Sequence, residues 1–124
     1  MGKLEYEQLT YKIRGAIFEV YNLLGPGFKE TVCHNSLREE FDKQKLKYSD
    51  KKRIKITYKG KDVGIYEPDF IVEDKIIIEI KAVDIMPKVF EKQLYSYLKA
   101  AKYKIGILVN FGGDSLDIRR RIFG

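Results

Sequence analysis

Apolar residues recur at helical spacing in the first third of the chain, and this pattern predicts two amphipathic helices. The first is expected over residues 6–24, and Gly25-Pro26-Gly27 ends it. The second is expected over residues 30–44, where Cys33, Leu37 and Phe41 lie four residues apart. The buried stripe of the first helix is predicted to consist of Leu9, Ile13, Ala16, Ile17, Val20 and Leu24.

The period then changes from helical spacing to strict alternation, which predicts three strands. The first spans residues 51–58 and places basic side chains on its outer face. A turn at residues 59–62 leads into a second strand over residues 63–72, in which Pro68 marks an edge or a bend. After a turn at residues 73–75, the sequence IIIEIK over residues 76–81 predicts the most apolar and central strand.

A third helix and a further strand complete the pattern. Pro87 is favoured at a helix start, and Phe90, Leu94, Leu98 and Ala101 form the expected buried stripe. The strand at residues 104–110 follows after a short connection, so a βαβ crossover is expected to make it parallel to the strand at residues 76–81. Residues 115–123 fit either a helix or an edge strand. The predicted order is α-α-β-β-β-α-β, an α/β domain built on one mixed sheet.

Composition narrows the classes of protein to which the chain can belong. A length of 124 residues predicts a single domain, and no apolar run approaches the roughly 18–20 residues of a membrane span. One cysteine and one histidine exclude an internal disulfide, a thiolate zinc site and a His-rich metal cluster. Zinc hydrolases, HNH-type nucleases and most triad hydrolases are therefore excluded. The first ten residues lack the apolar region of a secretory signal, so we expect a soluble cytoplasmic domain.

Positive charge is concentrated in one segment. The chain has 24 basic and 18 acidic residues, a net charge of +6. Residues 43–55 alone contain seven basic residues against Asp50, which also amounts to +6. Such a segment is typical of a polyanion-binding face. A solvated stretch that serves solubility is the alternative.

Charged side chains interrupt the apolar strand at residues 76–81. Glu79 and Lys81 share one face of it, because successive side chains alternate between faces. If residues 73–75 form a three-residue loop, Asp69 lies opposite Glu79 on that face; a two-residue loop would bury Asp69 among apolar side chains, at a cost. Two facing carboxylates repel each other, and a divalent cation is the usual compensation. A purely structural ion-pair network is the alternative.

Pro68-Asp69 followed by Glu79-Ile80-Lys81 resembles the signature of the PD-(D/E)XK nuclease superfamily. Gln93 and Tyr97, four residues apart on the third predicted helix, are similar to the Q-x-x-x-Y motif of RecB-type nucleases. For this second motif, a core tyrosine and a surface glutamine are the alternative.

A third resemblance covers nearly the whole chain. Residues 24–32, LGPGFKETV, resemble the defining segment of the GxxExxY proteins, a branch of the same superfamily. Gly27 and Glu30 match the pattern, whereas Cys33 replaces its tyrosine. The tail is similar as well, with Asn110-Phe111-Gly112 followed by residues 115–120. Glu30 has a simpler explanation, since an acid in the first turn of a helix complements its dipole.

These resemblances imply a fold and an activity. The implied fold is a restriction-endonuclease-like core (α-β-β-β-α-β, with a mixed central sheet) preceded by an extra N-terminal helix. The implied activity is Mg²⁺- or Mn²⁺-dependent hydrolysis of nucleic-acid phosphodiester bonds, with DNA favoured over RNA. The metal ligands would be Asp69, Glu79, the carbonyl of Ile80 and Glu30.

The remaining site residues have other implied roles. Lys81 would stabilise charge in the transition state, while Gln93 and Tyr97 would position the water or the strand. A catalytically weak or inactive nucleic-acid-binding or protein-interaction module on the same fold is the alternative function. Dimerisation would enlarge the footprint, but the sequence does not show it. The expected phosphate-binding residues are Lys51, Lys52, Arg53, Lys55, Arg119, Arg120 and Arg121.

Overall fold

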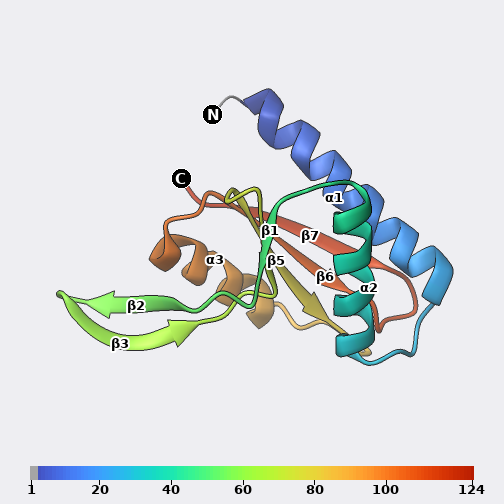
Figure 1. Cartoon of the computed structure of the whole chain (residues 1–124). Coiled ribbons are helices and arrows are strands. Elements are labelled where there is room, and N and C mark those ends of the chain that lie inside the picture. The colour runs from blue at the N-terminus through green and yellow to red at the C-terminus, as the bar shows by residue number, and fades with distance from the viewer. Residues whose placement is uncertain (1–2) are drawn as a thin grey trace.

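The computed structural model describes residues 3–124, except for the side chain of residue 4. Three helices and seven strands make up this part of the chain (Figure 1). In chain order they are α1 (Lys3–Leu24), α2 (Glu30–Lys43), β1 (Tyr48–Asp50), β2 (Ile54–Tyr58), β3 (Lys61–Tyr66), β4 (Phe70–Val72), β5 (Ile76–Lys81), α3 (Val89–Ala101), β6 (Ile105–Asn110) and β7 (Asp117–Ile122).

A mixed five-stranded sheet forms the centre, with the strand order β1-β4-β5-β6-β7. β5 and β6 run parallel through the α3 crossover, and the other neighbouring pairs are antiparallel. Helices α1 and α2 lie on one side of this sheet and α3 on the other (Figure 1). This arrangement confirms the predicted restriction-endonuclease-like core, with α1 as the additional N-terminal helix.

β5 separates two apolar clusters, as its alternation predicted. Ile76, Ile78 and Ile80 are fully buried in the cluster that packs under α1 and α2. Ile77 belongs to the cluster under α3, and the alternation directs Glu79 and Lys81 to that side. The polar end of β5 therefore opens toward α3.

The connection from β4 to β5 has the predicted three-residue turn. Phe70 pairs with Ile78 and Val72 with Ile76. One further step in this register places Asp69 opposite Glu79. Glu73 and Asp74 both adopt positive φ values, 54° and 53°, which brings the chain round in so short a turn.

The predicted single sheet was wrong, because the expected second strand divides at Pro68. Its first part, β3, pairs only with β2 and forms a separate two-stranded sheet. Pro68 is buried and has no amide hydrogen to donate, so the ladder cannot continue through it. The strand that pairs with β4 on this side is β1, which the sequence did not predict.

The structure also resolves the tail of the chain. Residues 117–122 form β7, an edge strand antiparallel to β6, rather than a helix. Within residues 3–124, no helix is long and apolar enough to cross a membrane.

Candidate functional site

Asp69 and Glu79 meet where β4 begins and β5 ends. Oδ2 of Asp69 accepts a hydrogen bond of 2.7 Å from the backbone N–H of Ile80. Glu79 accepts a hydrogen bond from the hydroxyl of Tyr66, the last residue of β3. Each carboxylate is thus held by a donor from a different strand, which fixes both at the open end of the sheet.

Burial and mutual repulsion perturb this pair. Burial raises the pKa of Glu79 to about 7, and the negative charge of Asp69 adds to the increase. The hydrogen bond from Tyr66 and the charge of Lys81 act in the opposite direction. Burial and the nearby Glu79 also raise the pKa of Tyr66, so its phenol stays protonated and remains a donor. A carboxylate poised to ionise near neutral pH is typical of a functional site.

Lys81 brings a positive charge to the same place. Its Nζ lies 4.6 Å from the centroid of the Phe90 ring on α3, a cation–π contact. Its charge lowers the pKa of both Glu79 and Glu30, so the field of the ammonium group reaches both carboxylates. The three charges of the D…ExK pattern therefore converge on one face of the sheet.

Glu30 reaches this site from the first turn of α2. Burial raises the pKa of its carboxyl group, and the negative charge of Asp69 raises it further. A carboxylate that served only the helix dipole would have no reason to lie within the field of Asp69, although its position suits that role as well.

His34, the single histidine of the chain, also lies at this site, and the sequence analysis gave it no role. It lies one turn after Glu30, is only 5% exposed, and stacks on Phe70 with ring centroids 4.2 Å apart. Its Nε2 is 2.9 Å from Oδ1 of Asp50, whose other oxygen is 2.8 Å from the guanidinium of Arg38. The spacing of four residues between Glu30 and His34 was the available signal, because such residues share a helix face.

The second ring nitrogen of His34 points toward the candidate site. Nδ1 lies 3.4 Å from Oδ1 of Asp69 and has no hydrogen-bond partner in the described part of the chain. If Nε2 donates its hydrogen to Asp50, the neutral ring leaves a lone pair on Nδ1. The contact with Asp69 is an ion pair only when the ring is protonated. A cavity of about 360 Å³ opens here, lined by Glu30, Thr31, His34, Asn35, Arg38, Asp50, Lys51 and Asp69.

The arrangement of Asp69, Glu79 and Lys81 on adjacent strands agrees with the comparison of the whole sequence with protein families. Residues 7–122 match the PD-(D/E)XK nuclease superfamily, which is nearly the whole chain. The chain belongs to this superfamily. A search of curated proteins found no match.

Two solved structures share the PD-(D/E)XK fold of this chain. An alkaline exonuclease (LHK-Exo) from Laribacter hongkongensis has a TM-score of 0.52 at 17% sequence identity, and the match covers 70% of this chain and 52% of that protein. SSO0001 has a TM-score of 0.55 at 21% identity, and the match covers 96% of this chain and 60% of that protein. The chain thus spans little more than half the length of either structure.

The two residues of the Q-x-x-x-Y motif differ in their contacts. Tyr97 stacks on Tyr66 with ring centroids 4.0 Å apart and planes 3° apart, so it supports the side chain that holds Glu79. Gln93 is exposed, and among the described residues no hydrogen bond joins it to the site. Phe90, Leu94 and Leu98 pack in the cluster under α3, as predicted. A role for Gln93 stays a prediction.

The predicted phosphate-binding residues lie in two places. Lys51, Lys52, Arg53 and Lys55 are exposed on β2 and the segment before it; Arg53 is 2.9 Å from Glu67, and Lys55 is 3.6 Å from Asp62. Arg119 on β7 is paired with Asp117 at 2.7 Å and Glu91 at 3.2 Å, and Arg121 is also paired with Glu91. Arg120 is exposed. The segment before β2 is therefore the more accessible positive surface.

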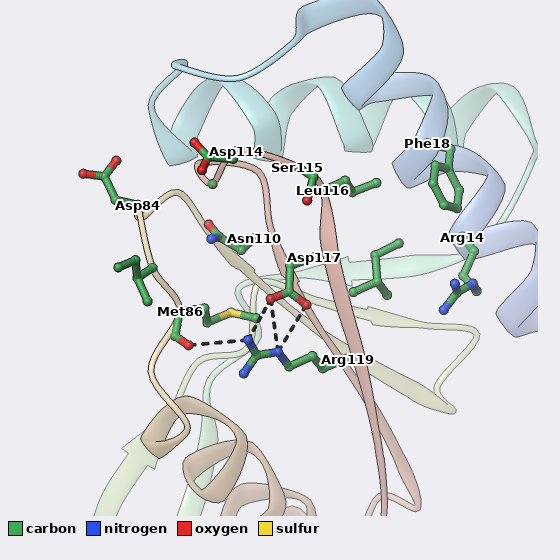
Figure 2. A pocket seen from close by; sticks show the side chains of 13 residues that line it. Arg14, Phe18, Asp84, Met86, Asn110, Asp114, Ser115, Leu116, Asp117 and Arg119 are labelled. Carbon is green, nitrogen blue, oxygen red and sulfur yellow. Dashed lines mark hydrogen bonds and ion pairs between the residues drawn. The ribbon is translucent and has the colours of Figure 1, made fainter.

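A second cavity, of about 560 Å³, lies between α1, the loop after β5 and the β6–β7 connection (Figure 2). The buried Asn110 lines it and joins two loops, since its side chain bonds both backbone groups of Val83 and the amide of Gly112. Asp117 and Arg119 also line it and are joined to each other by hydrogen bonds (Figure 2). The D…ExK residues do not line this cavity, so it is separate from the candidate site.

The donor set of the site suits a divalent cation. Asp69, Glu79 and Glu30 offer carboxylate oxygens, and His34 offers an unpartnered nitrogen. Among residues 3–124, no three His, Cys, Asp or Glu side chains already surround a common point as a metal site would. Glu79 is instead engaged by Tyr66 and Asp69 by Ile80. A cation held by these groups would therefore require the carboxylates to rotate away from their present donors.

Proposed function

We propose that the protein is a nuclease that depends on Mg²⁺ or Mn²⁺ and hydrolyses phosphodiester bonds of DNA. The observation that carries this proposal is the convergence of Asp69, Glu79 and Lys81 at the open end of the sheet, in a chain of the PD-(D/E)XK superfamily. Members of this superfamily generally use divalent metals. The narrower assignment to the GxxExxY branch is part of the proposal, and Gly27 supports it, because its φ of +98° favours glycine.

The proposed metal ligands are Asp69, Glu79, Glu30 and the backbone carbonyl of Ile80, with His34 as an added nitrogen donor. Two ligand atoms of one small cation usually lie about 3 Å apart, because each bond is about 2.1 Å long. The 3.4 Å between Nδ1 of His34 and Oδ1 of Asp69 is close to that spacing. Asp50 would orient the ring through Nε2, as carboxylates commonly do for metal-binding histidines.

Each residue of the site then has a definite task. The cation, when bound, supplies charge that offsets the scissile phosphate and lowers the pKa of a water molecule. Lys81 would stabilise the negative charge that develops on the phosphate, and its contact with Phe90 limits the directions in which the ammonium can point. Tyr66, supported by Tyr97, would orient Glu79. Gln93 would position the water or the strand from the exposed side of α3.

Affinity for nucleic acid would come from the exposed basic residues. Lys51, Lys52, Arg53 and Lys55 would bind backbone phosphates, and so would Arg120. Arg119 would first have to exchange its partners Asp117 and Glu91 for a phosphate, so we expect it to contribute least. Formation of a homodimer would double this surface.

The free, buried thiol of Cys33 suits the reducing cytoplasm.

The test is a cleavage assay with Mg²⁺ or Mn²⁺ on linear duplex, single-stranded and branched DNA and on the same forms of RNA. Asp69→Asn is the control, because it removes the charge while an amide oxygen remains to accept from Ile80. We expect cleavage of DNA that needs both the metal and Asp69. Metal-independent cleavage, or equal activity of Asp69→Asn, would contradict the proposal.

A cation could bind only after Asp69 and Glu79 rotate away from their present donors. This requirement favours one alternative function, a nucleic-acid-binding module of the same fold with little catalysis. Binding of DNA without cleavage under any of these metal conditions would support that module.

A further inference from the structure

The β2–β3 hairpin is a positively charged arm that extends from the body of the protein. Figure 1 shows it reaching away from the central sheet beside α3. Residues 54–66 contain three basic residues and one acidic residue, and residues 51–53 directly before them add three more positive charges. A positively charged arm continuous with a basic segment is suited to a polyanion.

The base of the arm is rigidly joined to the candidate site. Ile54, Ile56 and Tyr66 pack in the cluster under α3, and the hydroxyl of Tyr66 bonds Glu79. Only Glu67 and Pro68 separate Tyr66 from Asp69, and Pro68 is buried. The direction of the arm is therefore fixed relative to the two carboxylates.

The exposed surface of the arm carries apolar as well as basic side chains. Tyr58 is 59% exposed, Val63 61% and Ile65 50%. The register shifts by one residue between Ile56 and Thr57, which makes Val63 the additional residue of a β-bulge. Lys59 and Lys61 flank the turn at Gly60. Apolar side chains among lysines suit the edges of bases between two lines of phosphates.

The shape of the arm distinguishes among nucleic acids. The major groove of B-form DNA is about 12 Å wide and admits a two-stranded β-ribbon, whereas that of A-form RNA is too deep and narrow for side chains to read. β3 has six residues and so spans about 20 Å, which corresponds to about six base pairs at 3.4 Å each. A duplex that lies along the arm would present this groove at a fixed distance from the site.

We propose that the β2–β3 hairpin enters the major groove of duplex DNA about six base pairs from the phosphate at the Asp69–Glu79 site. This inference rests on the proposed function for the position of the scissile phosphate but not for the binding itself. A second copy of the chain is the competing occupant of the exposed apolar residues. The net charge of the arm opposes such pairing, because two arms would repel each other.

The experiment measures affinity in EDTA, so that binding is tested without cleavage. The ligands are a B-form duplex, the duplex RNA of equal sequence, the single strand, and the DNA duplex with glucosylated 5-hydroxymethylcytosines, which fill the major groove. We expect the glucosylated duplex and the RNA duplex to bind at least tenfold more weakly than unmodified DNA. Equal affinity for all three duplexes would overturn the proposal, whether or not the protein cleaves DNA.

Variants locate the binding surface on the arm. Lys59→Gln with Lys61→Gln should weaken binding to the DNA duplex about tenfold and remove most of the difference between unmodified and glucosylated DNA. The matched control is Lys3→Gln with Lys12→Gln, which removes two exposed charges from α1, outside the basic segment at residues 43–55. An equal loss of affinity in the control pair would show that only total charge matters and would contradict the proposal. Sedimentation shows whether the wild type forms a dimer that Val63→Ser disrupts. Such a dimer would place a second copy of the chain on the arm and would also overturn the proposal.

Discussion

The carboxyl end of β5 and the β2–β3 hairpin meet at Tyr66 but are built in opposite ways. At β5 the side chains are mostly buried, negatively charged on balance and held by donors from several elements. On the outer part of the hairpin they are exposed and positively charged on balance, and the ion pairs described there join Arg53 to Glu67 and Lys55 to Asp62. The difference fits the proposed function, in which β5 would carry the chemistry and the hairpin would carry the binding.

Lys81→Ala should give the largest effect and should separate the two regions most clearly. If Lys81 stabilises the transition state as proposed, loss of its ammonium should reduce turnover on DNA by about 10²–10³-fold. Metal affinity, measured by calorimetry, should stay equal or rise slightly, because a positive charge has left the site. Glu79→Gln should instead weaken metal binding. If both variants only lower the melting temperature, Glu79 and Lys81 form a structural ion pair, and the proposed separation of chemistry from binding is wrong.

Neutralising Lys51, Lys52 and Arg53 together should change binding and leave chemistry intact. The slope of log affinity against log salt concentration should flatten by about one unit for each DNA phosphate that the protein no longer neutralises. Turnover at saturating DNA should stay within about twofold of the wild type. A large loss of turnover with unchanged affinity would assign this segment to the catalytic region instead.

His34→Ala tests whether the β5 region extends to α2. If Nδ1 is a metal ligand, the affinity for Mn²⁺ should fall by about 10–100-fold, with a smaller loss for Mg²⁺, which prefers oxygen donors. Asp50→Asn keeps the ring in its stack on Phe70 and should give a loss in the same direction. Asp62→Asn on the hairpin is the matched control. Unchanged Mn²⁺ affinity in both His34→Ala and Asp50→Asn would show that His34 is not a metal ligand and that its contact with Asp69 is structural.

Stability should depend on pH through β5. Because the pKa of Glu79 is raised from 4.5 to about 7 in the folded protein, folding favours its protonated form. This contribution is complete below pH 4.5 and is lost as the pH rises through 7. Urea denaturation in EDTA should show the free energy of unfolding falling by roughly 1–3 kcal/mol between pH 5 and pH 8. Glu79→Gln should remove this part of the decline, and a decline of equal size in that variant would assign it to other groups.

The sequence was sufficient for the centre of the fold because the decisive information there is local. The alternation of Ile76 to Lys81 determined which side chains share a face, and the cost of burying Asp69 selected the three-residue turn. The approach of Asp69 to Glu79 followed from that register. Roles for these residues, and for Gln93 and the basic segment, stay predictions.

The elements that sequence reasoning missed depend on contacts between distant segments. β1 has three residues and is a strand only because β4 lies beside it. His34 and Asp50 are 16 residues apart and meet only when α2 packs over the sheet. Tyr66 reaches Glu79 because β3 leaves the sheet at Pro68, where the pattern predicted one bent strand. Periodicity does not contain these long-range arrangements.

The hydrogen bond between Asp69 and the Ile80 amide has a consequence for how this chain could evolve. Because β4 begins only at Phe70, a side chain and not a strand satisfies that amide. Loss of the aspartate would leave a partly buried donor unpaired, at a cost of about 1–3 kcal/mol. Selection for folding alone would thus retain an acceptor at position 69, aspartate or asparagine, after activity had disappeared. Lys81 contacts the Phe90 ring, and its loss would leave no buried donor unpaired, so selection for folding alone would retain it less strongly. Among descendants of this protein, the lysine would therefore be a better marker of an active enzyme than the aspartate.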